Sequence, residues 1–200
     1  GSESITDKTV SGKKVKNSYS LCLDDIIRIN KNLDLQSEEQ TNNYISEKYK
    51  RIIRSWLIYK DKNYIAINKP SGIAVQGGTK VKINVDGILE GLRFSAKEKP
   101  KLIHRLDKQT SGILILARSL KSAAFAGDLF KNKKIKKTYL AVLSGKVLRT
   151  KGKIDIPIIN KYKESDAMTL YETLFTSKNL SLVKINPLTG RKHQIRKHFF

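Results

Sequence analysis

The feature that most constrains the fold is the apolar run ILILA at residues 113–117, which directly follows the polar block HRLDKQTSG at 104–112. A run this short and this rich in β-branched residues is typical of a buried strand. The Thr-Ser-Gly sequence ahead of it is typical of a tight turn. The chain is therefore predicted to hold one carboxylate, that of Asp107, on a tight connection into a buried strand.

Other short apolar runs predict further strands that end at turns. They are two runs within 56–68 that enter a turn at 69–72, a run at 139–143 that ends at Gly145, and a run at 180–185 followed by a turn at 187–190.

Only two segments predict helices. Residues 120–132 are amphipathic, and Ser119 is suited to cap the N-terminus of that helix. Residues 192–198 predict the start of a second helix. Strands thus outnumber helices and do not alternate strictly with them, which favours an α+β fold with a largely antiparallel sheet.

The chain is strongly basic, and its 200 residues are enough for one good hydrophobic core. It has 40 Lys and Arg against 18 Asp and Glu, a net charge of +22. Such a charge attracts polyanions and makes their binding salt-dependent. A general bias toward Lys, Ile and Asn is the alternative explanation, so the charge favours a nucleic-acid partner without deciding it.

Composition also argues against several classes of protein. The single cysteine, Cys22, excludes an intramolecular disulfide, and three His with one Cys show no zinc-ligand spacing, so no metal site is predicted. Glycine motifs for nucleotide phosphates are absent from the sequence, so no cofactor is predicted. The longest apolar run falls far below the ~20 residues of a membrane-spanning helix. With no signal peptide visible, we expect a cytoplasmic protein without a membrane partner.

Asp107 is the leading candidate for chemistry. Arg105 and Lys108 flank it, and such cations favour a carboxylate that is ready to act as a nucleophile or base. The alternative is an Asp that caps a turn, the common fate of Asp before Ser, Thr and Gly. The residue types alone favour the turn cap.

Four sequence blocks taken together favour a chemical role for Asp107 over the turn cap. They are NKPSG at 68–72, RLDKQTSG at 105–112, KKTYLAVLSG at 136–145 and NPLTGRKHQIRKH at 186–198. With these blocks the chain resembles the RluA-type family of RNA pseudouridine synthases, and within it the C branch of ribosomal large subunit synthases. The resemblance implies a pseudouridine synthase fold, α+β, with a largely antiparallel mixed sheet flanked by helices and loops. It also implies cofactor-free isomerisation of uridine in RNA.

The resemblance assigns three catalytic residues. Asp107 would attack the sugar or abstract a sugar proton to give a glycal, and the sequence does not choose between these routes. Tyr139 would stack on the flipped base or assist loss of the C5 proton; its alternative is a core-packing role. Arg196 would pair with Asp107; its alternative is an exposed helix residue. His193 and His198 are expected to make structural polar contacts and not to be catalytic.

The resemblance and the charge pattern together suggest RNA contacts. Arg105 would fill the space left by the flipped nucleotide, or simply pair with a carboxylate. Arg191 would support its loop or contact phosphate. The rigid NKPSG turn would give structural support to the site, and Lys69 within it would contact phosphate. Lys136 and Lys137 belong to a lysine cluster that is either a solvated charge run or a phosphate contact.

The expected organisation has three parts. Residues 1–32 resemble part of an S4-like RNA-binding module, 33–55 are a polar linker, and 56–200 form the catalytic domain. Family members continue past residue 200 with more sheet, so we expect this domain to be incomplete at its C-terminal end.

Two other functions stay open at this point. One is a catalytically inactive RNA-binding protein of ribosome assembly on the same fold. The other is a glycosidic-bond hydrolase, which usually needs a second carboxylate, and no matching block supplies one. For the synthase, 23S ribosomal RNA is the expected partner, transfer RNA is the alternative, and a monomer is expected.

Overall fold

The computed structural model describes residues 9–10, 13–14, 22–24, 26–28, 45–77, 83–160 and 163–199. The chain divides into two compact units, Gly1–Tyr44 and Ile45–Phe200. Within the described ranges, no helix combines the length and the apolarity needed to span a membrane.

The first unit contains a small antiparallel sheet of three short strands. They are β1 (Thr9–Val10), β2 (Lys13–Lys14) and β3 (Ile27–Arg28), in the order β2-β1-β3. The likeness of this stretch to an S4-type module stays a prediction.

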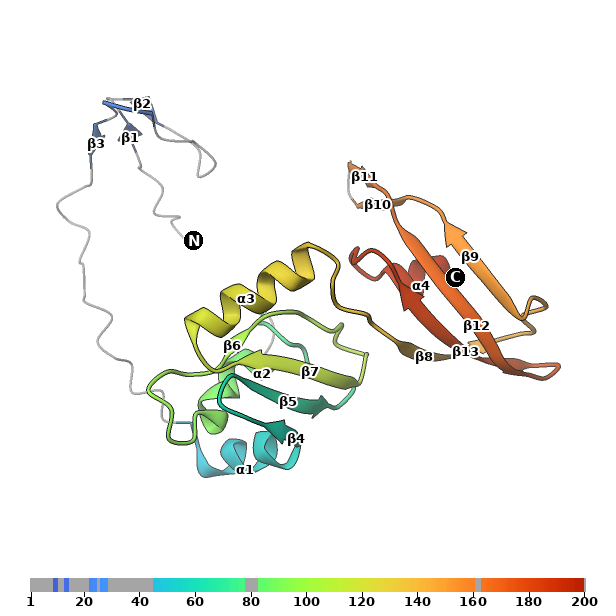
Figure 1. Cartoon of the computed structure of the whole chain (residues 1–200), viewed down its shortest axis with the longest axis horizontal. Coiled ribbons are helices and arrows are strands. Elements are labelled where there is room, and N and C mark those ends of the chain that lie inside the picture. The colour runs from blue at the N-terminus through green and yellow to red at the C-terminus, as the bar shows by residue number, and fades with distance from the viewer. Residues whose placement is uncertain are drawn as a thin grey trace, which may run out of the picture. The chain divides into compact units, whose positions relative to one another are not determined.

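The second unit begins with a four-stranded antiparallel sheet in the order β4-β5-β7-β6 (Figure 1). Its strands are β4 (Leu57–Lys60), β5 (Tyr64–Lys69), β6 (Lys101–Leu102) and β7 (Gly112–Ala117). The prediction of a buried strand over 113–117 is confirmed, because β7 is a central strand and Leu114, Leu116 and Ala117 are buried. Asp107 lies in the connection from β6 to β7.

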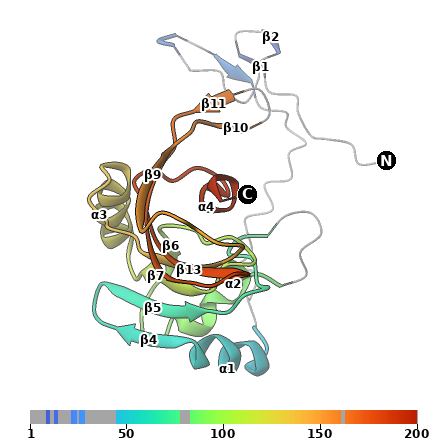
Figure 2. The same ribbon diagram turned by 90° about the vertical axis from the view of Figure 1, so that its right-hand side faces the viewer.

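The core lies on one face of this sheet. Ile65 and Ile67 of β5 are paired with Leu116 and Leu114 of β7, and all four are fully buried. Three helical segments complete this cluster: α1 (Glu47–Ser55), α2 (Val85–Ile88) and the 3-10 helix η1 (Leu89–Leu92). Figure 2 shows α1 beside β4.

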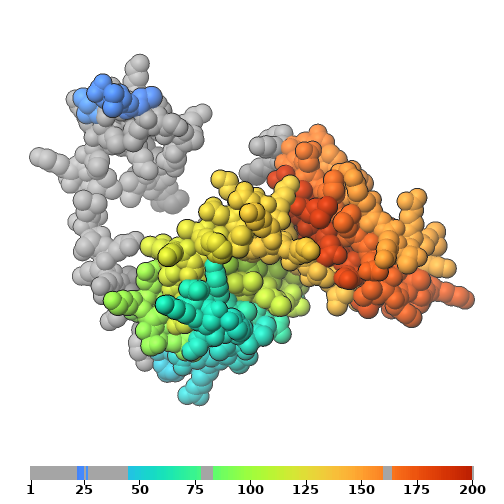
Figure 3. Space-filling view, in the orientation of Figure 1, coloured from blue at the N-terminus to red at the C-terminus, as the bar shows by residue number. Residues whose placement is uncertain are grey.

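The helix α3 (Leu120–Lys131) packs against β7 and β6. The Tyr64 hydroxyl donates to the carbonyl of Ser122 across 3.2 Å, and Tyr64 points away from the face that carries Ile65. The α3 helix therefore covers the second face, and its outer side forms part of the molecular surface (Figure 3). The predicted cap is confirmed, since Ser119 Oγ accepts from the Ser122 N–H at 3.1 Å.

The expected linker extended to residue 55, but its last part is helix α1, which belongs to the second unit. Tyr49, Ile53 and Trp56 give this helix an apolar stripe at helical spacing, and Ile53 is fully buried. Charged residues surround this narrow stripe, so the segment reads as polar in the sequence. The part of the linker at 33–44 lies outside the described residues.

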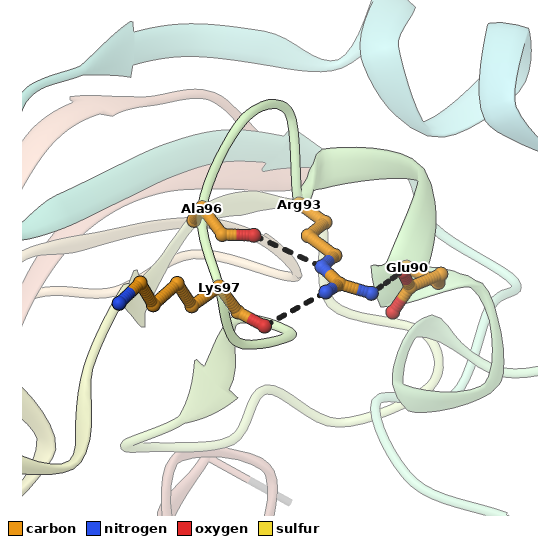
Figure 4. A network of polar contacts seen from close by, with 4 residues as sticks. All are labelled: Glu90, Arg93, Ala96 and Lys97. Carbon is orange, nitrogen blue, oxygen red and sulfur yellow. Dashed lines mark hydrogen bonds and ion pairs between the residues drawn. The ribbon is translucent and has the colours of Figure 1, made fainter. Parts of the chain in front are cut away.

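The loop that leads into β6 is held by one arginine (Figure 4). The Arg93 guanidinium donates to the carbonyls of Ala96 at 2.9 Å and Lys97 at 2.8 Å, and to Glu90 Oε1 at 3.0 Å. These three bonds fold the chain back on itself after η1 and direct it toward β6.

A second antiparallel sheet follows, in the order β8-β13-β12-β9. Its strands are β8 (Tyr139–Ser144), β9 (Lys151–Asp155), β12 (Met168–Thr176) and β13 (Leu180–Pro187). The pair β10 (Ile158–Asn160) and β11 (Lys163–Ser165) forms a separate hairpin, and helix α4 (Gln194–His198) contacts β13. The predicted α+β class and antiparallel pairing are confirmed. The helix expected at 192–198 begins later, because His193 has a left-handed backbone with φ 56°.

The close contact between α1 and η1 gives a stability prediction. A Cβ on Gly91 would lie 2.8 Å from Ile53 Cγ2 and 3.0 Å from Lys50 Cα, so part of α1 must move. We expect Gly91→Ala to lower the free energy of unfolding by about 1–3 kcal/mol in urea titration. Gly127→Ala in α3 is the matched control. Apart from its chain neighbours and the backbone of its own helix, no atom lies within 4 Å of its added Cβ, so the change should be neutral or stabilise by up to about 1 kcal/mol. Equal effects of the two changes would contradict this packing.

Candidate active site

The carboxylate of Asp107 lies on the loop between β6 and β7, where about a third of its side chain is exposed. The Thr110 N–H donates to the Asp107 carbonyl at 3.0 Å and closes a turn. Gly112 then begins β7 with φ +121°, a conformation that side chains rarely adopt. The Thr-Ser-Gly sequence thus fixes the short distance between Asp107 and the buried strand.

A buried ammonium group holds this loop against the neighbouring one. Lys69, at the end of β5, is fully buried. Its Nζ donates to the carbonyls of Pro70 at 2.8 Å, Ile73 at 2.8 Å and Lys108 at 3.4 Å. The Gly72 N–H also donates to the Lys108 carbonyl at 2.8 Å. The residue next to Asp107 is therefore tied by its main chain to the NKPSG turn.

The structure does not support the predicted contact of Lys69 with RNA phosphate. Its side chain is fully buried, and its ammonium group is already bonded to carbonyls. Burial lowers the pKa of Lys69, and the negative charge of Asp107 opposes that shift. Lys69 therefore shapes the site electrostatically and through the main chain, from inside the protein.

The structure brings Tyr139 to the same place. Tyr139 is half-buried at the start of β8 and pairs with Ile185 of β13. Burial raises the pKa of its phenol, and the negative charge of Asp107 raises it further. The phenol is therefore protonated at neutral pH, and an aromatic face and a carboxylate share one site.

The side chain that lies next to Asp107 in the structure is His193. Its Nε2 lies 3.8 Å from Asp107 Oδ1. Arg196, the predicted partner, is exposed on α4, and the described residues include no ion pair between Arg196 and Asp107. The left-handed backbone of His193 starts α4 late and turns this imidazole toward the carboxylate. Sequence reasoning gave His193 a structural role, and its only signal was its place in the same motif as Arg196.

Gln194 is a second residue that sequence reasoning missed. It is buried, and its Oε1 accepts from Thr189 Oγ1 at 2.7 Å and from the Arg191 N–H at 3.0 Å. Its Nε2 donates to the Met168 carbonyl at 3.0 Å and to Thr169 Oγ1 at 2.9 Å. Gln194 thereby ties the turn before α4 to the start of β12.

The remaining predicted RNA contacts divide into two kinds. Arg191 Nε donates to the Asp166 carbonyl at 2.8 Å, and Lys137 Nζ lies 3.5 Å from the Thr189 carbonyl. Both of these cations thus support loops, and burial lowers the pKa of Lys137. Arg105 and Lys136 are exposed, so their charges face solvent.

The site so far offers a carboxylate, a protonated phenol and an imidazole. In the part of the chain that the structure describes, no group of three His, Cys, Asp or Glu side chains could hold a metal ion. Such a set suits nucleophilic or acid–base chemistry.

Comparison with known proteins decides the family. Residues 63–200 match the model of the RNA pseudouridylate synthase family. The chain belongs to this family. The match covers all four sequence blocks in full and most of the catalytic domain, so the resemblance to RluA-type synthases is confirmed.

Individual relatives agree with this assignment. Ribosomal large subunit pseudouridine synthase C of Rickettsia bellii is 37% identical over 206 residues, covering 94% of this chain and 68% of the relative. The protein of the same name from Rickettsia felis is 41% identical, covering 74% of this chain and 53% of the relative. The chain thus spans about half the length of several curated relatives.

A solved structure supports the fold. The human RNA pseudouridylate synthase domain containing 4 superposes with a TM-score of 0.66 and 28% identity, covering 74% of this chain and 65% of that chain. The predicted pseudouridine synthase fold is confirmed.

The buried ammonium group gives a prediction on stability. Lys69→Met keeps a side chain of similar length and removes the ammonium donor from the carbonyls of Pro70 and Ile73, while the Lys108 carbonyl keeps only the Gly72 N–H. We expect the free energy of unfolding to fall by about 1–3 kcal/mol and the amides of residues 108–112 to exchange faster. Lys62→Met, an exposed change in the turn before β5, should stay within about 0.5 kcal/mol of wild type. Wild-type stability and exchange in Lys69→Met would show that the ammonium group does not hold the loop.

Proposed function

We propose that this protein isomerises uridine to pseudouridine in RNA, with Asp107 as the catalytic carboxylate. The observation that carries the proposal is the placement of Asp107: its loop is tied to a buried lysine, and it interacts electrostatically with Tyr139. This arrangement occurs in a chain of the RNA pseudouridylate synthase family.

The reaction breaks the C1′–N1 bond and joins C1′ to C5 of the same uracil. In one route, an oxygen of Asp107 bonds to C1′ as N1 leaves with the electron pair. In the other, Asp107 removes the C2′ proton and a glycal forms. The uracil anion then turns, C5 bonds to C1′, and the carboxylate leaves or the C2′ proton returns. C5 finally loses its proton and N1 gains one, so the atoms balance without a cofactor.

Tyr139 is proposed to stack on the flipped base. Its raised pKa supports this role over that of a general base, because a protonated phenol cannot accept the C5 proton. Its half-buried ring also leaves an aromatic surface beside the carboxylate. A fixed stacking surface keeps the freed uracil close to C1′ while it turns.

Arg196 is proposed as the guanidinium partner of Asp107 during the reaction. It lies three residues after His193, on the segment that already reaches Asp107. A paired guanidinium would stabilise the carboxylate in the desolvated complex with RNA. Arg105 and Lys136, both exposed, are the proposed contacts to the RNA itself.

The proposed substrate is 23S ribosomal RNA, with transfer RNA as the alternative. Relatives named for the ribosomal large subunit support the first choice. A relative from Arabidopsis thaliana is named RNA pseudouridine synthase 4, mitochondrial, and is 32% identical over 76% of this chain and 39% of its own length. We propose that the protein works as a monomer in the cytoplasm.

The test is release of tritium from RNA labelled at uridine C5, with 23S ribosomal RNA fragments and transfer RNA transcripts as separate substrates. Wild type should release tritium from the ribosomal fragments. Asp107→Asn should lower the rate by at least about a thousandfold and leave the Kd for RNA within about threefold, since phosphate contacts dominate affinity. Asp155→Asn is the control, because Asp155 is an exposed residue of β9 paired with Lys153.

Each outcome has a clear meaning. Tritium release by Asp107→Asn at a near wild-type rate would exclude the catalytic role of Asp107. Release from transfer RNA alone would exclude the ribosomal substrate. Binding of RNA by wild type without any release would favour the inactive RNA-binding protein.

A further inference from the structure

His104 makes a hydrogen bond that extends the first sheet beyond its last paired strand residue. It lies two residues after the end of β6 and three before Asp107. Its Nε2 accepts from the main-chain N–H of Ile115, in the middle of β7, at 2.9 Å. The ring is thus attached to the strand that follows the Asp107 loop.

The register of the sheet explains this bond. In the antiparallel pair of β6 and β7, Lys101 is opposite Ala117 and Leu102 is opposite Leu116. The same register would place residue 103 opposite Ile115. The main chain leaves the sheet before that pair forms, and the His104 side chain bonds the N–H of Ile115 instead. An unpaired N–H at a central strand would otherwise be costly.

Two further observations fix the state of this ring. It stacks on Phe130 of α3, with ring centroids 4.9 Å apart and an interplanar angle of 27°. Burial lowers the pKa of His104 to about 4, and the positive charge of Lys137 contributes to that shift. The imidazole is therefore neutral at physiological pH and has a nitrogen lone pair available as an acceptor.

We propose that His104 is a positioning residue for Asp107, because its imidazole takes the place of a main-chain carbonyl and fixes where the catalytic loop leaves the sheet. The inference rests on the proposed function. His104 holds the N-terminal side of the loop, while Lys69 and Gly72 hold Lys108 on the other side of Asp107. Only Arg105 and Leu106 separate His104 from Asp107, so little freedom is left to the carboxylate.

The experiment compares three variants of the same side chain. His104→Gln keeps an acceptor at about the position of Nε2. His104→Phe keeps a ring against Phe130 and has no acceptor. His104→Asn has an acceptor that is too short to reach Ile115. Rates at saturating RNA and KM are measured by tritium release, amide exchange is measured at Ile115 and over 105–110, and thermal melting shows which variants are folded.

We expect the Phe and Asn variants to lose about 10–100-fold in kcat with KM changed by less than about threefold. Both should lose protection of the Ile115 amide, and the Gln variant should recover most of the rate and the protection. The proposal would be overturned if His104→Phe matched or exceeded His104→Gln in both kcat and protection of the Ile115 amide. The role of the ring would then be packing and not hydrogen bonding. If wild type releases no tritium, the proposed function fails. The positioning by His104 is then tested by amide exchange alone, which should be faster over 105–110 in the Phe variant than in the Gln variant.

Discussion

The arrangement of this site depends on the buried ammonium group of Lys69. A charge removed from water is tolerated only when other groups solvate it, and three main-chain carbonyls do so here. Two of those carbonyls belong to the turn after β5 and the third to the residue that follows Asp107. Solvating the lysine therefore requires the two loops to lie together. The same lysine is a positive charge that acts on Asp107 from inside the protein.

The rest of the site adds to this fixed loop. Asp107 is held by bonds on both sides, from His104 to β7 and from Lys108 to the NKPSG turn. The second sheet contributes Tyr139 at the start of β8 and His193 before α4. Gln194 acts on the turn before α4 as Lys69 acts on the Asp107 loop. In each case one buried polar side chain forms hydrogen bonds to two separate segments of the chain.

The sequence predicted the elements well because local patterns determine them. The strand after HRLDKQTSG, the capped helix after Ser119 and the strands from Tyr139 and Leu180 all follow from periodicity and turn residues. Burial of a charged side chain leaves no such pattern, so Lys69 was assigned to phosphate although only long-range packing decides its environment. The same limit applies to His193, whose approach to Asp107 depends on a left-handed backbone that residues other than Gly adopt only uncommonly. Helix α1 was missed because its apolar stripe is narrow.

The central claim is that the protein rearranges a glycosidic bond at Asp107 without hydrolysing it. Chromatography of the nucleosides from fully digested RNA, before and after incubation with the protein, tests this most directly. The account predicts that pseudouridine is gained in the amount that uridine is lost, with no free uracil, and that Asp107→Asn produces no pseudouridine. Free uracil with abasic sites, or equal pseudouridine from wild type and Asp107→Asn, would contradict it.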